Sequence, residues 1–267
     1  MPFERIAIVG VGLIGGSFAL ALREAGFTGR LLGVSRPATL AKAIALGVID
    51  EGGTLEEIVP QADLVFLAQP IGVMLETIDA LGPLLKPGSL VTDAGSTKRL
   101  IVERAASLPR FVGGHPMAGK EQQGVEASEA GLFRNRPWIL TGDPGPDFTG
   151  WLERIGARLV YLTPEEHDTQ VALSSHLPQL LSTTLASLLT GQVTISTAGP
   201  GLESMTRLAL SSHELWRDIL ATNRPAIAAA LGQFAAELEA VRSELVRGEL
   251  DARFVKAREF GLSIRQK

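Results

Sequence analysis

The chain has 267 residues, a formal net charge of −4 and no cysteine. This length predicts one large or two ordinary domains around a sizeable core. The negative charge argues against nucleic acid or an anionic membrane as a partner. The absence of cysteine excludes disulfides, thiol nucleophiles and cysteine-bound metals. There is no basic leader-like segment and no apolar run of about 18 residues, so we expect a cytoplasmic protein with neither a membrane span nor a bound metal.

The N-terminal stretch Arg5–Ser17, RIAIVGVGLIGGS, organises the first part of the chain. Its apolar run Ile6–Val9 predicts a buried parallel strand, and Leu13–Leu22 continues with helical spacing. A glycine-rich turn joins the two segments. Strand, glycine turn and helix in this order are typical of a dinucleotide-binding unit.

Three glycines of this turn follow the pattern GxGxxG, and each has a physical role. Gly10 allows the tight turn, Gly12 lets the backbone approach a pyrophosphate, and Gly15 lets helix and strand pack closely. We expect the pyrophosphate to bind the free N–H groups at the start of the helix, near Leu13 and Ile14, where the helix dipole is positive. A glycine-rich turn without a ligand is the less favoured alternative.

The residues after the next expected strand, Arg30–Val34, predict the choice of cofactor. A unit that binds NAD usually carries Asp or Glu there to hold the ribose 2′-hydroxyl. This chain has Ser35 and Arg36, and a hydroxyl beside a guanidinium would hold a 2′-phosphate by charge-assisted hydrogen bonds. We therefore favour NADP over NAD, and a solvated loop cation is the alternative interpretation of Arg36.

Strand and helix patterns alternate through the following residues. The expected helices are Pro37–Leu46, Gly72–Leu81 and Thr97–Ser107, and the expected strands are Asp63–Ala68, Ser89–Thr92, one that begins at Phe111–Gly113, Pro137–Thr141 and Arg158–Leu162, with Gly142–Gly150 as a turn-rich connector. This alternation predicts an α/β domain with a doubly wound, mainly parallel sheet, whose ligands bind beyond the carboxyl ends of the strands. The residues placed there are Ser35, Gln69, Asp93–Ser96 and His115.

The pattern changes at Thr163. Thr163 can cap a helix, Pro164 suits its first turn, and Glu166 completes a capping box. Only helical periods follow. We therefore expect two domains, an α/β dinucleotide-binding domain over residues 1–163 and an all-α domain over residues 164–267.

The helical part has breaks at Gly191–Gly201 and near Asn223–Pro225, and a second capping box is expected at Ser211 and Glu214.

The helical part is also unusually apolar. Val171–Leu189, which contains His176 and Gln179, is expected to form a buried helix. Leu180–Leu189 and Ile227–Val241 are apolar on more than one face, so we expect them to be buried within the domain or across a subunit interface. A homodimer through this domain is the resulting hypothesis.

The stretch Gly113–Glu121, GGHPMAGKE, surrounds one imidazole with small residues after a strand. A substrate or a nicotinamide ring can therefore approach His115 closely. Because histidine titrates near neutrality, His115 can accept the proton of an alcohol as hydride leaves. A structural histidine is the alternative.

The stretch Asp93–Lys98, DAGSTK, also follows a strand. Ser96 can cap the next helix and can hydrogen-bond a ligand hydroxyl. Lys98 falls in the first turn of that helix, where a cation opposes the macrodipole, so an anionic ligand nearby would explain it. A simple cap and a solvated lysine are the alternatives.

Several motifs occur in chain order: GVGLIGGS, GVSR, DAGSTK, GGHPMAGKEQQG, EEHD, SHLP and ESMTRLALSSHELWRDI. Their order resembles the prephenate/arogenate dehydrogenase family of tyrosine biosynthesis over nearly the whole chain. The resemblance implies a Rossmann-like α/β domain followed by an all-helical domain that contacts the substrate and forms a dimer. It also implies an oxidative decarboxylation, in which hydride passes from ring carbon C4 of a cyclohexadiene to the nicotinamide and CO2 leaves from C1.

The resemblance further implies roles for single residues. His115 is the base or hydrogen-bond acceptor toward the substrate 4-hydroxyl, with Ser96 as its partner, and Arg207 grips a substrate carboxylate. Gln179 stands where many prephenate-using members have histidine, so the choice between prephenate and arogenate stays open. Glu121 and Trp216 match positions near the mouth of the pocket, and His167, Asp168 and His176 match helical positions beside the cleft, as ordering groups. Lys98 is also expected to contact the substrate, from its place after the strand.

Two other classes of function remain as alternatives. A 3-hydroxyacid dehydrogenase or an imine reductase would share the architecture, but Thr163–Arg217 lacks the helix-borne lysine on which the former relies. A non-catalytic NADP-binding module would keep the glycine turn and have no use for His115, Ser96 and Arg207 together.

Overall fold

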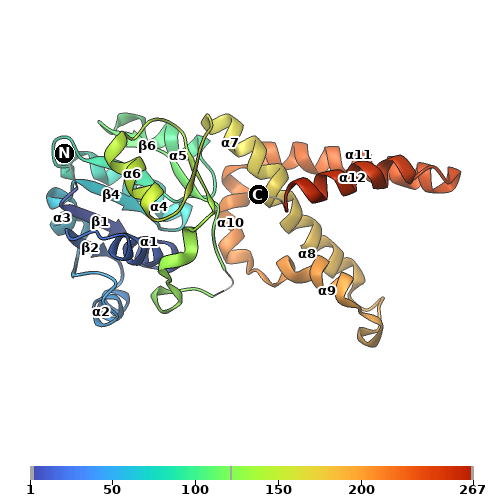
Figure 1. Cartoon of the computed structure of the whole chain (residues 1–267), viewed down its shortest axis with the longest axis horizontal. Coiled ribbons are helices and arrows are strands. Elements are labelled where there is room, and N and C mark those ends of the chain that lie inside the picture. Colours follow the sequence, from blue (N-terminus) through green and yellow to red (C-terminus); the bar gives the residue numbers. More distant parts are fainter. Residues whose placement is uncertain (1–2, 121, 266–267) are drawn as a thin grey trace.

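The computed structural model describes residues 3–120 and 122–265. Figure 1 shows an α/β region at one side and a helical region at the other. The strands are β1 (Arg5–Val9), β2 (Arg30–Val34), β3 (Glu51–Gly53), β4 (Leu64–Leu67), β5 (Leu90–Asp93), β6 (Phe111–Val112), β7 (Gly114–Pro116), β8 (Pro137–Leu140) and β9 (Arg158–Tyr161). The helices of the α/β region are α1 (Leu13–Glu24), α2 (Pro37–Ala45), α3 (Leu55–Ile58), α4 (Ile71–Leu81), α5 (Arg99–Arg104) and α6 (Pro146–Arg154). Those of the helical region are α7 (Pro164–Val171), α8 (Leu177–Leu189), α9 (Pro200–Thr206), α10 (His213–Thr222), α11 (Arg224–Arg247) and α12 (Asp251–Ser263).

The main sheet has six strands in the order β3-β2-β1-β4-β5-β6, and every pairing in it is parallel. The predicted doubly wound α/β fold is therefore confirmed. Because β1, β4 and β5 are neighbours, their carboxyl ends share one edge of the sheet. That edge carries Gly10, Gln69 and Asp93, each at or just after the end of its strand.

A second sheet of three strands has the order β7-β8-β9, with β7 antiparallel and β9 parallel to β8. The late strands expected at Pro137–Thr141 and Arg158–Leu162 are present, but they pair here and not in the main sheet. Two glycines allow the chain to pass close to the main sheet just before β7. A Cβ at Gly113 would lie 2.7 Å from Thr141 Oγ1, and one at Gly114 would lie 2.5 Å from the Asp93 carbonyl oxygen. The chain therefore crosses the end of β5 at close range and carries His115 with it.

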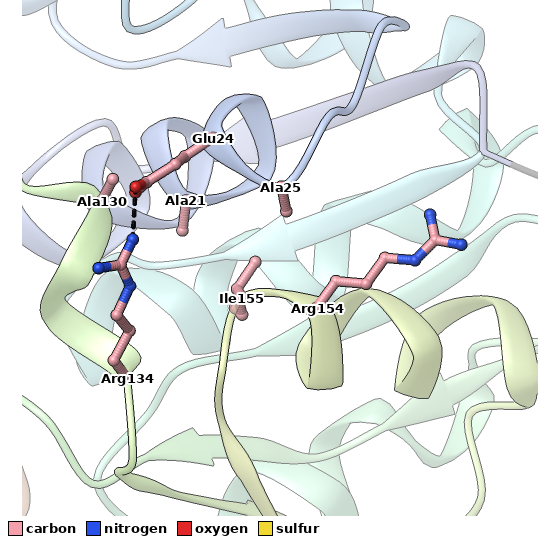
Figure 2. A pocket seen from close by; sticks show the side chains of 7 residues that line it. All are labelled: Ala21, Glu24, Ala25, Ala130, Arg134, Arg154 and Ile155. Carbon is pink, nitrogen blue, oxygen red and sulfur yellow. Dashed lines mark hydrogen bonds and ion pairs between the residues drawn. The ribbon is translucent and has the colours of Figure 1, made fainter.

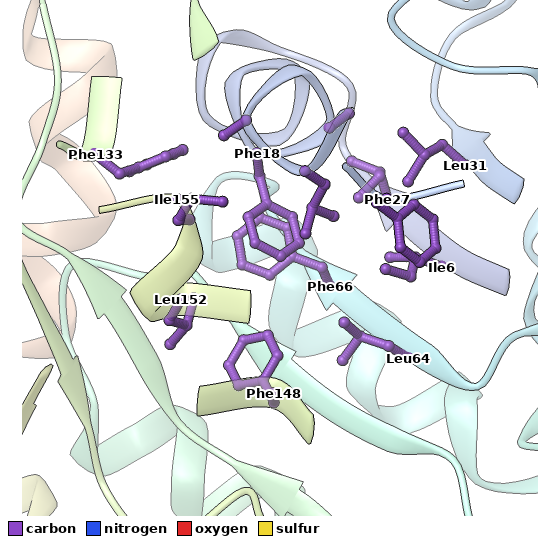
Figure 3. Packing of buried hydrophobic residues seen from close by; sticks show 14 of the residues in the cluster. Ile6, Phe18, Phe27, Leu31, Leu64, Phe66, Phe133, Phe148, Leu152 and Ile155 are labelled. Carbon is purple, nitrogen blue, oxygen red and sulfur yellow. The ribbon is translucent and has the colours of Figure 1, made fainter. Parts of the chain in front are cut away.

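An aromatic cluster joins the two sheets. The Phe18 ring of α1 lies 4.3 Å from that of Phe66 on β4 and 6.4 Å from that of Phe148 on α6. Trp138 of β8 is fully buried among these rings. Figure 3 shows Phe18, Phe66 and Phe148 gathered beneath α1. This packing holds the second sheet, and the histidine on its first strand, against the nucleotide-binding fold.

Several local expectations in this region need correction. β3 and α3 lie in a stretch for which no element was expected, and Thr54 and Glu57 form a capping box at the start of α3. Gly142–Gly150 is a connector only in its first half, because α6 begins at Pro146. The helix expected from Thr97 begins at Arg99 and ends as a short 3-10 turn.

The helical region begins as predicted. The Thr163 side chain accepts a hydrogen bond from the Glu166 N–H, and the Glu166 carboxylate accepts one from the Thr163 N–H. The second capping box is wrong by one residue. Ser212, not Ser211, caps α10 by accepting from the N–H of Leu215, and an apolar side chain there cannot complete a box.

The expected buried helix over Val171–Leu189 is helical but only partly buried. One segment, Ala172–His176, is a π-helical turn, and α8 buries only Leu177, Gln179 and Ser182. The long helix α11 likewise buries few of its residues, and α12 buries none. In residues 3–120 and 122–265, no helix combines the length and apolarity that crossing a membrane requires.

Candidate active site

The glycine turn after β1 has the geometry that a dinucleotide needs. Gly10 has φ +99°, and a Cβ there would lie 2.6 Å from the Ala68 carbonyl oxygen. A Cβ at Gly15 would lie 2.1 Å from the Gly10 carbonyl oxygen, so α1 packs directly on the turn. A Cβ at Gly12 would meet no atom within 4 Å. The turn is therefore tight, closely packed behind and open in front, which fits a bound pyrophosphate.

Other predicted cofactor residues lie at the same edge. Leu13 and Ile14 open α1. Gln69 follows β4, and its Oε1 is buried without a hydrogen-bond partner among the described residues. Such an orphaned acceptor fits a site that a ligand hydroxyl completes. Ser35 and Arg36 follow β2, and the Arg36 side chain is exposed and makes no hydrogen bond or ion pair with the described part of the chain.

A buried ion pair fixes the loop after β5. The Lys98 ammonium donates to Asp93 Oδ2, and both side chains are 0% exposed. The N–H groups of Gly95 and Gly114 also donate to the Asp93 carboxylate, at 2.7 and 3.0 Å. Burial lowers the pKa of Lys98, and Asp93 acts against that shift. Asp93 thus compensates the charge of Lys98, and no anionic ligand is needed to explain it.

The expectation that Ser96 caps the following helix is wrong. The N–H groups of Lys98 and Arg99 at the start of α5 donate instead to the Asp168 carboxylate, at 2.6 and 3.0 Å. The cap therefore comes from the helical region, 70 residues along the chain from Lys98. Within the described residues the half-buried Ser96 hydroxyl makes no hydrogen bond, which leaves it able to bind a ligand.

His115 lies at the seam between the two regions. Its Nδ1 is 2.8 Å from Nε2 of His167, and Nδ1 of His167 is 2.8 Å from Oδ1 of Asp168. Burial holds the pKa of His115 well below 6.5, and the charges of His167 and Lys98 lower it further. Burial also lowers the pKa of His167, although the hydrogen bond that His167 donates to the Asp168 carboxylate acts in the opposite direction. His115 is therefore neutral at pH 7 and can accept a proton.

His176 is a third histidine, close enough to this pair to affect the charge of His115. Asn223 Nδ2 donates a hydrogen bond of 2.7 Å to the Asp168 carbonyl oxygen, and it lies 3.3 Å from His176 Nδ1. The His176 ring meets the Trp216 ring edge-on at 5.8 Å. Burial lowers the pKa of His176 to about 4. The Trp216 Nε1 is buried without a hydrogen-bond partner among the described residues, so its N–H can donate to a bound ligand.

The residues expected to contact substrate carboxylates lie farther into the helical region. Arg207 is exposed and begins the short turn Arg207–Leu210, which packs against α8. Gln179 Nε2 donates to the Leu208 carbonyl oxygen at 2.8 Å and to Thr183 Oγ1 at 3.2 Å. Both hydrogens of that amide are thus used within the chain, and Gln179 holds the turn that carries Arg207. Glu121 lies outside the described residues.

Two hollows on the α/β region contain none of the predicted site residues. One, of about 190 Å³, lies between α1 and α6, where Figure 2 shows Arg134 reaching to Glu24 while Arg154 extends elsewhere. The other, of about 360 Å³, adjoins Met117–Lys120, which follow β7. Across residues 3–120 and 122–265 no cluster of His, Cys, Asp and Glu is arranged to hold a metal ion.

The seam contains two residues to which the sequence assigned no role. Asp93 was noted only as a residue after a strand, and the DAGSTK motif was its sole signal. Asn223 was noted only as a helix break. Its contact with Asp168 joins the start of α11 to the end of α7 and has no signature in local spacing.

Comparisons with known proteins agree with this geometry. Residues 18–159 match the family model described as prephenate dehydrogenase, nucleotide-binding domain, and residues 163–258 match prephenate dehydrogenase, dimerization domain. The chain is 34% identical to a prephenate dehydrogenase of Bacillus subtilis, over 99% of this chain and 77% of that protein.

Two solved structures are also similar. A prephenate dehydrogenase of Aquifex aeolicus, in complex with hydroxyphenyl propionate and NAD+, has a TM-score of 0.89 at 33% identity and covers 100% of this chain and 99% of its own. Synechocystis arogenate dehydrogenase has a TM-score of 0.83 at 30% identity, with 98% and 99% covered. The chain therefore belongs to the prephenate dehydrogenase family.

Proposed function

We propose that the protein catalyses the oxidative decarboxylation of prephenate to 4-hydroxyphenylpyruvate, or of arogenate to tyrosine, in tyrosine biosynthesis. The observation that carries this proposal is the position of His115. A neutral imidazole lies beside the edge of the sheet that bears the open glycine turn, with the unbonded Ser96 hydroxyl in the loop before it. A base, a hydroxyl and a dinucleotide cradle together suit the oxidation of an alcohol.

The step balances with these groups. The substrate 4-hydroxyl gives its proton to His115, and hydride leaves ring carbon C4. Bound NAD(P) supplies the hydride acceptor. The electron pair of the bond between C1 and the carboxylate passes through the ring to the C4 oxygen, CO2 leaves and the ring becomes aromatic. The C4 oxygen then takes the proton back from His115, which completes the hydroxyl of the product and regenerates the base. Aromatisation supplies the driving force, so the tasks of the chain are to accept the proton and to orient the ring.

Arg207 is proposed to bind a substrate carboxylate through its planar guanidinium. Because both hydrogens of the Gln179 amide are already donated, Gln179 offers no donor to a second carboxylate. Its proposed role is to hold the turn that carries Arg207. Trp216 and His176 are proposed to line the substrate side of the seam.

The cofactor is proposed to be NADP in preference to NAD. The support is chemical, since Ser35 and the exposed Arg36 offer donors to a 2′-phosphate and no carboxylate follows β2 to repel it. Ser35→Asp should move the ratio of kcat/KM values toward NAD by reintroducing that carboxylate. An unchanged ratio would place recognition of the 2′-phosphate elsewhere.

A homodimer is proposed to form through the helical region. α11 and α12 expose large apolar side chains, among them Val246, Phe254 and Phe260. The matched family model carries the description dimerization domain. A second copy of the chain would cover surfaces of this kind.

The test is a set of initial rates with prephenate and arogenate, each offered NAD and NADP. The larger kcat/KM identifies the preferred pair. His115→Asn should lower kcat by about 10²–10⁴-fold with cofactor binding nearly unchanged. His213→Asn is the matched control, because His213 is exposed at the start of α10. Full turnover in His115→Asn, or no turnover of any pair by the unaltered protein, would overturn the proposal.

A further inference from the structure

Each ring nitrogen of His115 and His167 can be assigned as a hydrogen-bond donor or acceptor. Nδ1 of His167 is 2.8 Å from the Asp168 carboxylate, which can only accept, so the hydrogen of neutral His167 is on Nδ1. Nε2 of His167 is then a lone-pair acceptor. Nδ1 of His115 lies 2.8 Å from it and must donate. The remaining nitrogen of His115, Nε2, is consequently an acceptor.

The origin of this order is Asp168. Its carboxylate accepts from His167 and from the N–H groups of Lys98 and Arg99, and these bonds lower its pKa although burial opposes them. An ionised carboxylate is therefore the fixed end of the chain of hydrogen bonds. Asn223 holds the backbone of the same residue through its carbonyl oxygen.

We propose that His167 and Asp168 are positioning residues for the reaction. They hold His115 in the tautomer with hydrogen on Nδ1, so that Nε2 is free to take the proton of the substrate hydroxyl. They also stabilise the imidazolium that results, as the aspartate does in a Ser-His-Asp triad, here through one intervening imidazole. The inference rests on the role proposed for His115.

The proton balance is simple. The hydroxyl O–H bond breaks and an N–H bond forms at Nε2 of His115. The hydrogen on Nδ1 stays shared with His167, and Asp168 stays ionised throughout. The other charged or titratable groups that face His115 are Lys98, which is paired with Asp93, and His176. The Lys98 ammonium opposes the imidazolium, which makes support from Asp168 more important.

The arrangement also makes the tautomer of His115 depend on the contact between the α/β region and α7. His115 belongs to β7, whereas His167 and Asp168 belong to α7. The same carboxylate that orders the histidines caps α5 in the α/β region. The base is therefore ordered only when α7 is docked.

Two variants of similar size separate positioning from packing. Gln at position 167 can accept from His115 Nδ1, whereas Leu cannot. We expect His167→Leu to lower kcat by about 10²–10³-fold with little change in KM, and His167→Gln to recover at least roughly tenfold of that loss. His213→Gln is the matched surface control.

Asp168→Asn tests the charge. Without the carboxylate the His115 imidazolium loses support and the pKa of His115 falls. The acid limb of the kcat profile, where His115 becomes protonated, should therefore move to lower pH as kcat falls. A purely structural role for Asp168 would lower stability or raise KM and leave that limb in place.

Nitrogen-15 NMR of imidazole-labelled protein gives a readout that needs no turnover. The chain has four histidines, and single substitutions assign them. We expect hydrogen on Nδ1 and a bare Nε2 for both His115 and His167 in the unaltered protein. Hydrogen on Nε2 of His115, or equal loss of kcat in His167→Leu and His167→Gln with an unmoved acid limb in Asp168→Asn, would overturn the inference. Failure of the proposed function is distinct, because it would appear as an unaltered protein without turnover while the NMR result stands.

Discussion

The two regions that meet at the candidate active site differ in how each is stabilised internally. In the α/β region two large buried clusters surround the sheets, and the buried ion pair of Asp93 and Lys98 fixes the loop after β5. The helical region has one small cluster, formed by Ala172, Leu177, Ile227 and Ala230. Its α12 buries no residue, and Val246 and Phe254 are 85% and 71% exposed.

This contrast indicates which contacts hold the site residues of each region in place. The α/β region can position Gly12, Ser96 and the backbone of His115 by its own packing. The helical region depends on contacts outside itself, through Asp168 to the start of α5 and, as proposed, through α11 and α12 to a second copy. The largest perturbations are therefore expected inside the α/β core and smaller ones at the seam, the exposed helices and the helix caps.

The largest effect is expected from Asp93→Asn. The change removes the ion-pair partner of the buried Lys98 ammonium and a carboxylate that accepts from Gly95 and Gly114. We expect the free energy of unfolding to fall by about 3–5 kcal/mol, measured by urea denaturation. Arg242→Ala, which breaks an exposed pair with Glu239, should leave the midpoint unchanged. Equal midpoints for the two variants would show that the buried pair does not anchor this region.

The second largest effect is expected from acid, which should lower the free energy of unfolding through protonation of His176. The folded pKa of His176 is about 4 and its ordinary value is 6.5, because burial disfavours the charged ring. The unfolded chain therefore binds more protons between these values, so this stabilisation is complete above pH 6.5 and is lost as pH falls toward 4. The gap corresponds to about 3 kcal/mol. Urea midpoints measured from pH 7 to 4 should fall less steeply in His176→Gln than in His213→Gln, and parallel slopes would contradict the prediction.

The exposed helices give a smaller effect. Phe254→Asp places a charge on the apolar surface of α12 and should weaken association by at least about 2 kcal/mol, roughly thirtyfold in Kd. Sedimentation velocity over a dilution series measures the shift. The control is Leu46→Asp, which alters an exposed leucine of the α/β region and should leave the association unchanged. A monomeric unaltered protein would remove the proposed dimer.

The smallest effect is expected at the start of the helical region. Thr163→Ala removes the side chain that accepts from the Glu166 N–H, which should cost about 1 kcal/mol of stability. Thr163→Ser keeps the hydroxyl and should restore most of the loss in the same urea titration. If Ser and Ala were equally destabilising, the cap would not be the cause.

The features predicted correctly from the sequence share a local origin. The glycine turn between β1 and α1 and the capping box at Thr163 each depend on residues within one or two turns of each other. The alternation of strand and helix that indicates a parallel sheet is local as well. The wrong expectations at Ser96 and Ser211 also concerned local pairs, and there the helix began one or more residues later than the motif indicated.

Other features depend on contacts between distant residues. Nothing in the spacing of Pro137–Thr141 indicates that it pairs with β7 and leaves the main sheet. Burial of Lys98 against Asp93 could not be read from a lysine in a first turn, because a solvated side chain has the same sequence. The contribution of Asn223 was invisible for the same reason.

The dinucleotide-binding unit, the change to helices at Thr163 and the motifs of the family could be predicted without a structure, because each depends on residues that are neighbours along the chain. By contrast, tertiary packing alone makes Asp168 cap α5 and places His167 between Asp168 and His115. These contacts join residues 70 and 52 positions apart. They form because the packing of the two regions places the Asp168 carboxylate beside the N–H groups of Lys98 and Arg99 and beside the His167 imidazole. Local sequence preferences do not specify contacts of this kind.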